Sequence, residues 1–269
     1  MDTTMLGNAN DLGDAHKKLK ESSLFLSDYA SELLAVGATS ARVEMNVTRI
    51  AEHWGVSADI AILSKHIIMS TTDKETGKTY SIVGKSRHRP ISFFRNSALS
   101  RLSWQVVDNN MTVTEARSAF DHVVSQPHGN VWIVLLLTSL ANLSFCYLFG
   151  GDIWAMAVVF LATAVGYCAK ICLLRLKVDT RMVFVLSAFC ATILGCSCYV
   201  FNLGHTPEIA LGTSVLYLVP GIPFINSISD LIYGHNMCFV SRLINASVLT
   251  VCLSAGFIIG LLVMRIGTL

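Results

Sequence analysis

Five long apolar stretches in the second half of the chain constrain its fold more than any other feature. They cover residues 131–149, 153–169, 182–201, 209–229 and 243–264. Each is close to the roughly 20 residues that an α-helix needs to cross the hydrocarbon core of a bilayer. The sequence therefore predicts an α-helical multi-pass membrane domain over residues 127–269, with five transmembrane helices.

Charged side chains are concentrated ahead of these stretches. Of the 38 Asp, Glu, Lys and Arg residues, 28 lie in residues 1–129 and 10 lie in residues 130–269. This asymmetry indicates a soluble domain followed by a membrane domain. The net charge of +2 is too small to indicate nucleic acid as a partner.

The soluble half is predicted to form an α+β domain over residues 22–126. Apolar residues at helical spacing predict helices over residues 23–37, 40–54 and 93–107 and a shorter one from Thr112, which forms a capping box with Glu115. An isoleucine-rich run at 59–70 and an alternating run at 79–83 predict a hairpin or small sheet, with a turn near Gly77.

The N-terminus and the loop charges predict the orientation of the chain. Residues 1–21 are expected to form a flexible polar tail, and they lack the apolar core and cleavage site of a signal peptide. The loop between the second and third stretches carries the basic residues Lys170, Arg175, Lys177 and Arg181. The loops at 150–152 and 202–208 contain no Lys or Arg. The positive-inside rule therefore places the N-terminal domain in the cytoplasm and, after five spans, the C-terminus on the far side.

Motifs that would indicate catalysis or cofactor binding are absent from the sequence. It has no phosphate loop of the Walker type, no G-x-S-x-G nucleophile elbow and no HExxH zinc motif. All eight cysteines lie from Cys146 onward, mostly within apolar stretches, where small buried thiols are expected and not metal ligands. No enzyme activity, cofactor or metal is therefore predicted.

The fourth apolar stretch is interrupted in its middle by Pro220, Gly221 and Pro223. Because proline has no N–H, the carbonyls of Leu216 and Val219 are expected to lack helical partners. Broken backbone at membrane depth must face protein or a water-filled cavity, and transporters place solute or ion sites at such breaks. The alternative interpretation is a structural kink, since Pro and Gly are frequent in membrane helices.

Asn226 and Asp230 follow the break, with Ser227 and Ser229 nearby, and the first two share one face if this segment is helical. A carboxylate at the centre of a bilayer costs about 2.5–3.5 kcal/mol on insertion scales, so it usually lines a cavity or has a function. An amide, a carboxylate and freed carbonyls could ligate a polar solute or relay a proton. The candidate site for substrate or protons therefore consists of Pro220, Gly221, Pro223, Asn226 and Asp230.

Small residues at helical spacing occur in two of the apolar stretches. Ala162 and Gly166 form one pair, and Gly256 and Gly260 form the other. Such pairs permit close approach of two helix backbones. The pattern allows packing within the chain or against another subunit.

Residues 218–235, LVPGIPFINSISDLIYGH, resemble the signature of the threonine/serine exporter family. That signature is a Val-Pro-Gly-x-x-x-x-Asn-x-x-x-Asp pattern followed by a turn that contains glycine. The matching residues are Val219, Pro220, Gly221, Asn226, Asp230 and Gly234. Pro223 is an additional break, and His235 stands where the family pattern has an acidic residue.

The soluble half carries a second motif that is similar to the same family. The pattern is Gly-Ala-x-x-x-Arg-Val-Glu, and the matching residues are Gly37, Ala38, Arg42, Val43 and Glu44. Residues 149–152, FGGD, are similar to the loop after the first span of the family. The resemblance leaves the roles of Gly37, Arg42 and Glu44 unassigned.

The resemblance implies an efflux protein of the bacterial inner membrane, with a cytoplasmic domain ahead of its spans. Longer members fuse two membrane halves, whereas this chain is similar to the YjjP-type half, which pairs with a smaller YjjB-type membrane subunit. The implied substrate is succinate for the split type, and threonine and serine for the fused type. A homo-oligomer is the alternative assembly.

The leading hypothesis is a secondary transporter subunit that exports a small polar metabolite, driven by the proton gradient. The first alternative is a non-transporting membrane sensor or scaffold, whose cytoplasmic domain binds a ligand or a partner. The second alternative is a membrane-embedded enzyme, which the missing catalytic motifs disfavour.

Overall fold

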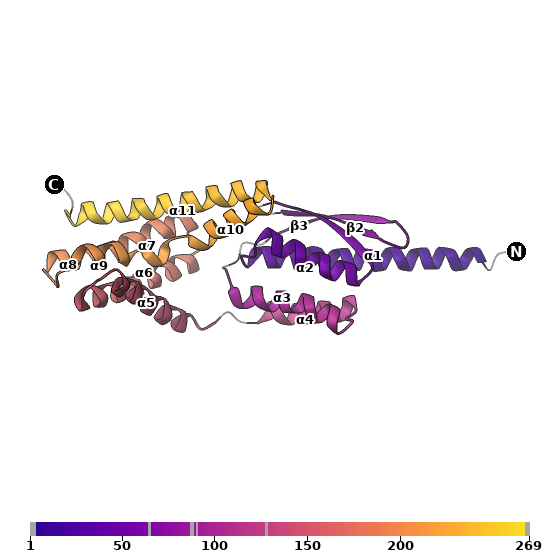
Figure 1. Cartoon of the computed structure of the whole chain (residues 1–269), viewed down its shortest axis with the longest axis horizontal. Coiled ribbons are helices and arrows are strands. Elements are labelled where there is room, and N and C mark those ends of the chain that lie inside the picture. The colour runs from indigo at the N-terminus through magenta and orange to yellow at the C-terminus, as the bar shows by residue number, and fades with distance from the viewer. Residues whose placement is uncertain (1–3, 64–65, 87–88, 90, 127–128, 267–269) are drawn as a thin grey trace. The chain divides into compact units, whose positions relative to one another are not determined.

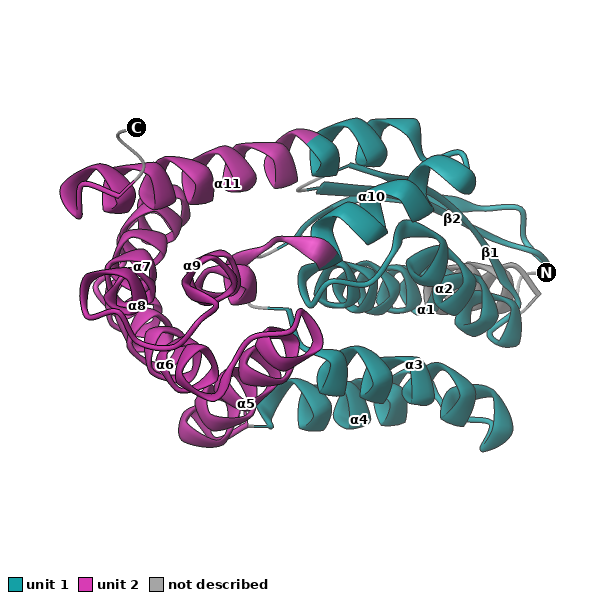
Figure 2. Ribbon diagram, turned by 60° about the vertical axis from the view of Figure 1, so that its left-hand side comes forward, with its two compact units in different colours: residues 1–126, 222–243 teal, residues 127–221, 244–269 magenta. Residues whose placement is uncertain are grey.

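A computed structural model describes the backbone of residues 4–63, 66–86, 89, 91–126 and 129–266, with side chains from residue 16 onward (Figure 1). The chain divides into two compact units (Figure 2). Unit 1 contains residues 1–126 and 222–243, and unit 2 contains residues 127–221 and 244–269. The grouping of 222–243 with unit 1 differs from the expected membrane domain at 127–269.

Unit 1 combines helices with a three-stranded antiparallel sheet in the order β1-β2-β3. Its N-terminal part contains α1 (Thr4–Ala35), α2 (Ser40–His53), β1 (Val56–Ile62), β2 (His66–Asp73), β3 (Thr79–Lys85), α3 (Phe93–Asp108) and α4 (Val113–Ser125). Val56 pairs with Asp73 across β1 and β2, and His66 pairs with Lys85 across β2 and β3. The predicted α+β class is confirmed, and the isoleucine-rich run contains parts of two strands and not one.

The core of unit 1 forms on both sides of α1 and α2. The sheet covers one side, and α3 and α4 cover the other (Figure 1). From α1, Phe25 and Tyr29 are completely buried, and the Phe25 ring meets the Phe120 ring edge to face at 5.8 Å between centroids. The Tyr29 hydroxyl donates to the carbonyl of Leu99 (2.8 Å), and burial raises the pKa of that hydroxyl. The predicted capping box is present at the start of α4.

The N-terminal segment differs from the expected flexible tail at residues 1–21. The structure describes residues 4–21 as the first part of α1, and residues 1–3 lie outside the described chain. Leu19 and Ser23 are buried, so the packed part of α1 begins before residue 22. Once that part is fixed, each added residue gains a helical hydrogen bond. The polar composition therefore did not indicate the secondary structure.

The described part of unit 2 is helical. Its elements are α5 (Val131–Leu148), α6 (Ile153–Arg175), α7 (Thr180–Gly195), the short α8 (Ser197–Val200), α9 (Pro207–Ser214), the 3₁₀ turn η1 (Leu216–Leu218) and the later part of α11 (Asn236–Val263). In the described chain, four helical segments are long and apolar enough to cross a membrane, and a fifth is a pair bent at a break between Leu218 and Gly221. The prediction of a multi-pass membrane protein is confirmed.

Small residues bring helices of unit 2 into close contact. A Cβ added at Gly256 of α11 would overlap the carbonyl oxygen of Val185 on α7. A Cβ at Gly260 would lie 2.8 Å from the Cβ of Thr192, further along α7. The Gly256 and Gly260 pair therefore packs within the chain, against α7. Packing within the chain was one of the two arrangements that the sequence allowed for this pair.

Candidate functional site

The break in the bent span satisfies its own backbone. The Val219 N–H donates to the Leu216 carbonyl (3.1 Å), and the Gly221 N–H donates to the Val219 carbonyl (2.8 Å). The two carbonyls that were expected to lack helical partners therefore have other donors, because tight turns replace the helical bonds ahead of α10 (Gly221–Ile232). Pro223 lies in the first turn of α10, where a backbone N–H has no helical acceptor.

Asp230 on α10 is completely buried in unit 1. Its Oδ1 accepts a hydrogen bond from the N–H of Ser40 (3.0 Å), and its Oδ2 lies 3.2 Å from Nη1 of Arg242 on α11. These last two atoms form no directed hydrogen bond with each other, so their contact is an ion pair held by charge alone. Nη2 of Arg242 donates instead to the Ala38 carbonyl (3.0 Å).

The first turn of α2 receives the Asp230 carboxylate. The Thr39 side chain caps this helix by accepting from the N–H of Arg42 (3.3 Å), which leaves the Ser40 N–H available to another acceptor. Helix N-termini carry a partial positive charge and favour anions. Asp230 therefore has two sources of positive potential, the end of α2 and the guanidinium of Arg242.

Asn226 contacts the turn between α1 and α2. Its Nδ2 donates to the Gly37 carbonyl at 2.9 Å. Gly37 has φ +95°, in the left-handed region that favours glycine, and a Cβ there would also meet the Ile91 side chain at 3.0 Å. The two motifs noted in the sequence therefore meet directly, with the Asn226 and Asp230 side chains bound to the backbone of Gly37 and Ser40.

Arg42 and Glu44 face different neighbours. Nη1 of Arg42 donates to Oδ1 of Asn96 on α3 (3.2 Å). Oε2 of Glu44 lies 3.3 Å from Nε2 of His235, which lies in the turn between α10 and α11. Arg42 therefore joins α2 to α3, and Glu44 joins α2 to the turn where the family pattern has an acidic residue.

Further contacts hold α10 and the start of α11 in unit 1. The Cys238 thiol donates to the Ile62 carbonyl at the end of β1 (3.2 Å), and the Ser227 hydroxyl donates to the Phe239 carbonyl (3.0 Å). Sequence reasoning did not select Arg242 or Cys238. The signal that could have found Arg242 is its position as a basic residue just before the last apolar stretch.

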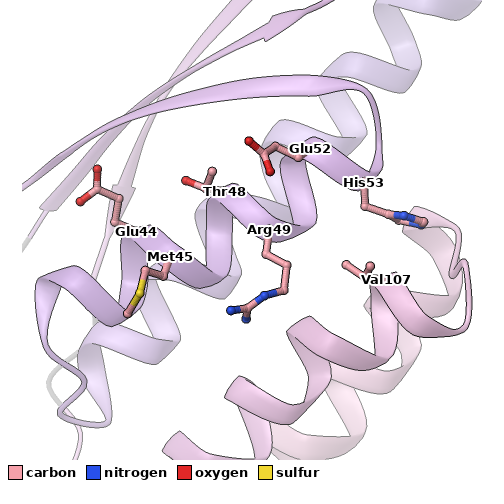
Figure 3. Close-up of a pocket in the computed structure, with 7 residues that line it drawn as sticks. All are labelled: Glu44, Met45, Thr48, Arg49, Glu52, His53 and Val107. Atoms are coloured by element: carbon pink, nitrogen blue, oxygen red, sulfur yellow. The ribbon is translucent and has the colours of Figure 1, made fainter.

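Glu44 also lines a groove of about 620 Å³ along the exposed face of α2 (Figure 3). The lining residues are Glu44, Met45, Thr48, Arg49, Glu52, His53 and Val107. Glu44, Thr48 and Glu52 lie on one side of α2, and Arg49 points toward α3 (Figure 3). The Arg49 guanidinium stacks 3.7 Å above the Trp104 ring and donates to Ser103 Oγ (2.7 Å). The described residues contain no group of three or more metal-binding side chains.

In unit 2, Asp152 ends the FGGD loop and caps α6. Its carboxylate accepts from the N–H of Ala155 (2.8 Å) and from the N–H of His205. These two backbone donors lower the pKa of Asp152 below its ordinary value of 3.8, and the Ala155 N–H has the larger effect. The carboxylate therefore joins the start of α6 to the loop ahead of α9.

This pKa shift predicts a pH dependence of stability. A carboxyl group whose folded pKa is depressed stabilises the fold above its unfolded pKa, and that stabilisation is lost as the pH falls through the folded pKa. We expect Asp152→Asn, which keeps a capping oxygen, to lower the melting temperature of the purified protein at neutral pH. The difference from the wild type should shrink below the ordinary pKa of 3.8. A difference that is the same at every pH would contradict this role.

Long apolar helices define a multi-pass membrane protein. A bent span followed by a helix with a buried carboxylate is an arrangement that occurs in membrane transporters. Residues 25–264 match the ThrE family, described as "Putative threonine/serine exporter". The chain therefore belongs to this family.

Three curated bacterial relatives are similar to the chain. It is 27% identical over 230 residues to the "Probable succinate transporter subunit YjjP" of Klebsiella aerogenes. The matched region covers 85% of this chain and 88% of that relative. The protein of the same name in Escherichia coli K12 is also 27% identical, over 85% and 89%. The "Probable threonine/serine exporter" of Mycobacterium tuberculosis is 24% identical over 87% of this chain and 44% of the relative. No solved structure matches the chain.

Proposed function

We propose that this protein is a subunit of an exporter in the bacterial inner membrane, which moves a small carboxylate-bearing metabolite by using the proton gradient. The substrate classes are dicarboxylates such as succinate and amino acids such as threonine and serine, following the names of the relatives. The observation that carries the proposal is the buried Asp230, paired with Arg242, in the helix that follows a broken span.

In the proposed mechanism, Asp230 alternates between Arg242 and a proton. Protonation removes the negative charge of Asp230, and the ion pair with Arg242 and the attraction to the α2 N-terminus then weaken. Asn226 would release Gly37 in the same movement or supply its amide to the solute. Pro220, Gly221 and Pro223 would provide the bend about which α10 moves, since they leave the backbone without continuous helical bonds.

The proposed assembly includes a second membrane subunit. The two YjjP relatives are named as transporter subunits, which supports a partner. We propose a smaller YjjB-like protein in this role, with a second copy of this chain as the other option. The sequence placed Lys170 and Arg175 in a loop, whereas α6 extends through both of them. The basic residues around the turn from α6 to α7, Arg175, Lys177 and Arg181, still support an N-terminal domain in the cytoplasm and a C-terminus on the far side.

The groove along α2 favours one alternative function, a sensor. It is lined by acidic and basic side chains. One of them, Glu44, also contacts His235 of the α10–α11 turn. A solute held there could change the Glu44–His235 contact without being transported. A sensor would bind threonine, serine or succinate in the purified full chain, and cells that contain it would show no flux.

The test of the exporter is efflux from cells loaded with labelled succinate, threonine or serine, with this chain alone and with its candidate partner. We expect Asp230→Asn to reduce efflux at least about tenfold, which corresponds to about 1.4 kcal/mol in the barrier. The matched control is Asp121→Asn, since Asp121 is exposed on α4. Normal efflux and normal pH dependence in Asp230→Asn would exclude Asp230 as proton carrier. No flux of any of the three solutes in the wild type would exclude these substrates.

A further inference from the structure

Lys170 is a basic residue within the apolar helices of unit 2. Among the described helices of that unit, it is the one Lys or Arg that lies outside a first or last turn. Its ammonium group lies 5.4 Å from the ring centroid of Phe184 on α7 and 5.8 Å from that of Tyr167. Aromatic faces attract a cation, but they leave its charge uncompensated.

No carboxylate compensates this charge in the described part of the chain. Among the described residues, no carboxylate oxygen lies within 4.0 Å of the Lys170 ammonium nitrogen. The acidic residues of unit 2 are at helix starts: Asp152 caps α6, Asp179 caps α7, and Glu208 lies in the first turn of α9. A partly buried cation without a counter-ion in an apolar setting favours an anion that comes from outside the chain.

Hydroxyl groups lie next to the aromatic neighbours of Lys170. The Tyr167 and Tyr217 rings are 6.3 Å apart between centroids, and Tyr217 belongs to η1, just before the break. The Tyr217 hydroxyl lies over Gly166, where an added Cβ would overlap it, and it donates a long hydrogen bond (3.5 Å) to the Ser187 carbonyl. The Ser187 hydroxyl is completely buried, and no described residue forms a hydrogen bond with it.

We propose that Lys170, with the hydroxyls of Tyr217 and Ser187, forms a carboxylate-recognition site for the exported solute. The ammonium supplies the charge, and the unpaired Ser187 hydroxyl supplies a hydrogen-bond donor. The Tyr217 hydroxyl can donate to the solute once it leaves the Ser187 carbonyl. A solute with two carboxylates gains more from this site than a zwitterion, whose ammonium is repelled by Lys170. This inference rests on the proposed exporter function and assigns its substrate class as organic anions.

An anionic lipid headgroup offers the same chemistry, because Lys170 is five residues from the end of α6 and its side chain is long enough to reach toward an interface. The first experiment therefore measures binding without transport. The purified full chain is reconstituted in neutral lipid and in lipid with phosphatidylglycerol. Its melting temperature is then followed with succinate and with succinamide, the neutral diamide.

We expect succinate to raise the melting temperature in neutral lipid and succinamide to have no effect. The effect of succinate should be lost in Lys170→Gln and kept in Lys170→Arg. Arg175→Gln is the matched control, since it removes one positive charge from the exposed last turn of the same helix. Stabilisation by phosphatidylglycerol alone, with no response to succinate, would assign the site to lipid and overturn the proposal.

Flux measurements separate this inference from the proposed function. We expect Lys170→Gln to raise the apparent KM for succinate about tenfold or more, as loss of about 1.4 kcal/mol of binding would. An unchanged KM with active transport would reject the Lys170 site and leave the exporter in place. Succinate binding that depends on Lys170 in a protein without flux would keep the site and reject the exporter.

Discussion

Replacing Arg242 by methionine will lower the free energy of unfolding by about 3–5 kcal/mol, because it leaves a buried carboxylate without its counter-charge. Asp230 is completely buried, and it faces Arg242 at 3.2 Å. The substitution also removes the hydrogen bond from Arg242 to the Ala38 carbonyl. The free energy is to be measured by denaturant titration of the purified protein in mixed micelles.

The double variant Asp230→Asn with Arg242→Met separates stability from transport. It removes both charges, and the amide oxygen that replaces the carboxylate can still accept from the Ser40 N–H. We therefore expect most of the stability to return, since a neutral pair carries no buried charge. Under the proposed mechanism, efflux should stay absent, because no carboxylate remains at position 230 to carry a proton. Additive losses in the double variant would show that the two side chains are not coupled.

Replacing Gly256 by leucine will have a comparably large effect on folding. Even the first atom of the new side chain would overlap the Val185 carbonyl oxygen, and backbone cannot move aside as the end of a flexible side chain does. Overpacking a well-packed site costs about 1–3 kcal/mol, and the remaining atoms of leucine add to this contact. The yield of monodisperse protein and its unfolding free energy are the measurements.

The control for Gly256 is Gly212→Ala in α9. An added Cβ at Gly212 would meet no atom within 4 Å, so alanine should be tolerated there. Alanine is also favoured over glycine in a helix interior, by about 0.5–1 kcal/mol. Equal losses in Gly256→Ala and Gly212→Ala would show that α11 does not pack on α7 through Gly256.

The membrane architecture could be predicted because its causes lie within single segments. Span length follows from the thickness of the bilayer, so the stretch 131–149 alone was sufficient to locate α5. The break at Pro220 follows from a missing N–H, and the capping box at Thr112 and Glu115 follows from three-residue spacing. None of these requires knowledge of a distant part of the chain.

The surroundings of Asp230 could not be predicted in the same way. Ser40 and Asp230 are 190 positions apart, and Asn226 and Gly37 are 189 positions apart. Hydropathy assigned α10 to a span, whereas its polar face packs in unit 1 through these two contacts. The donors to the Leu216 and Val219 carbonyls were missed for a different reason, since short local turns leave no periodic signal in the sequence.

The burial of Cys238 gives unit 1 an internal reporter of its own opening. The other seven cysteines all lie in unit 2, so this thiol has no competitor within unit 1. It is 1% exposed and donates to the Ile62 carbonyl, on the same short stretch of α11 that carries Arg242. A thiol-alkylating reagent can reach it only after the start of α11 leaves the end of β1. The rate of labelling at this one sulfur would therefore measure how often the surroundings of Asp230 come apart.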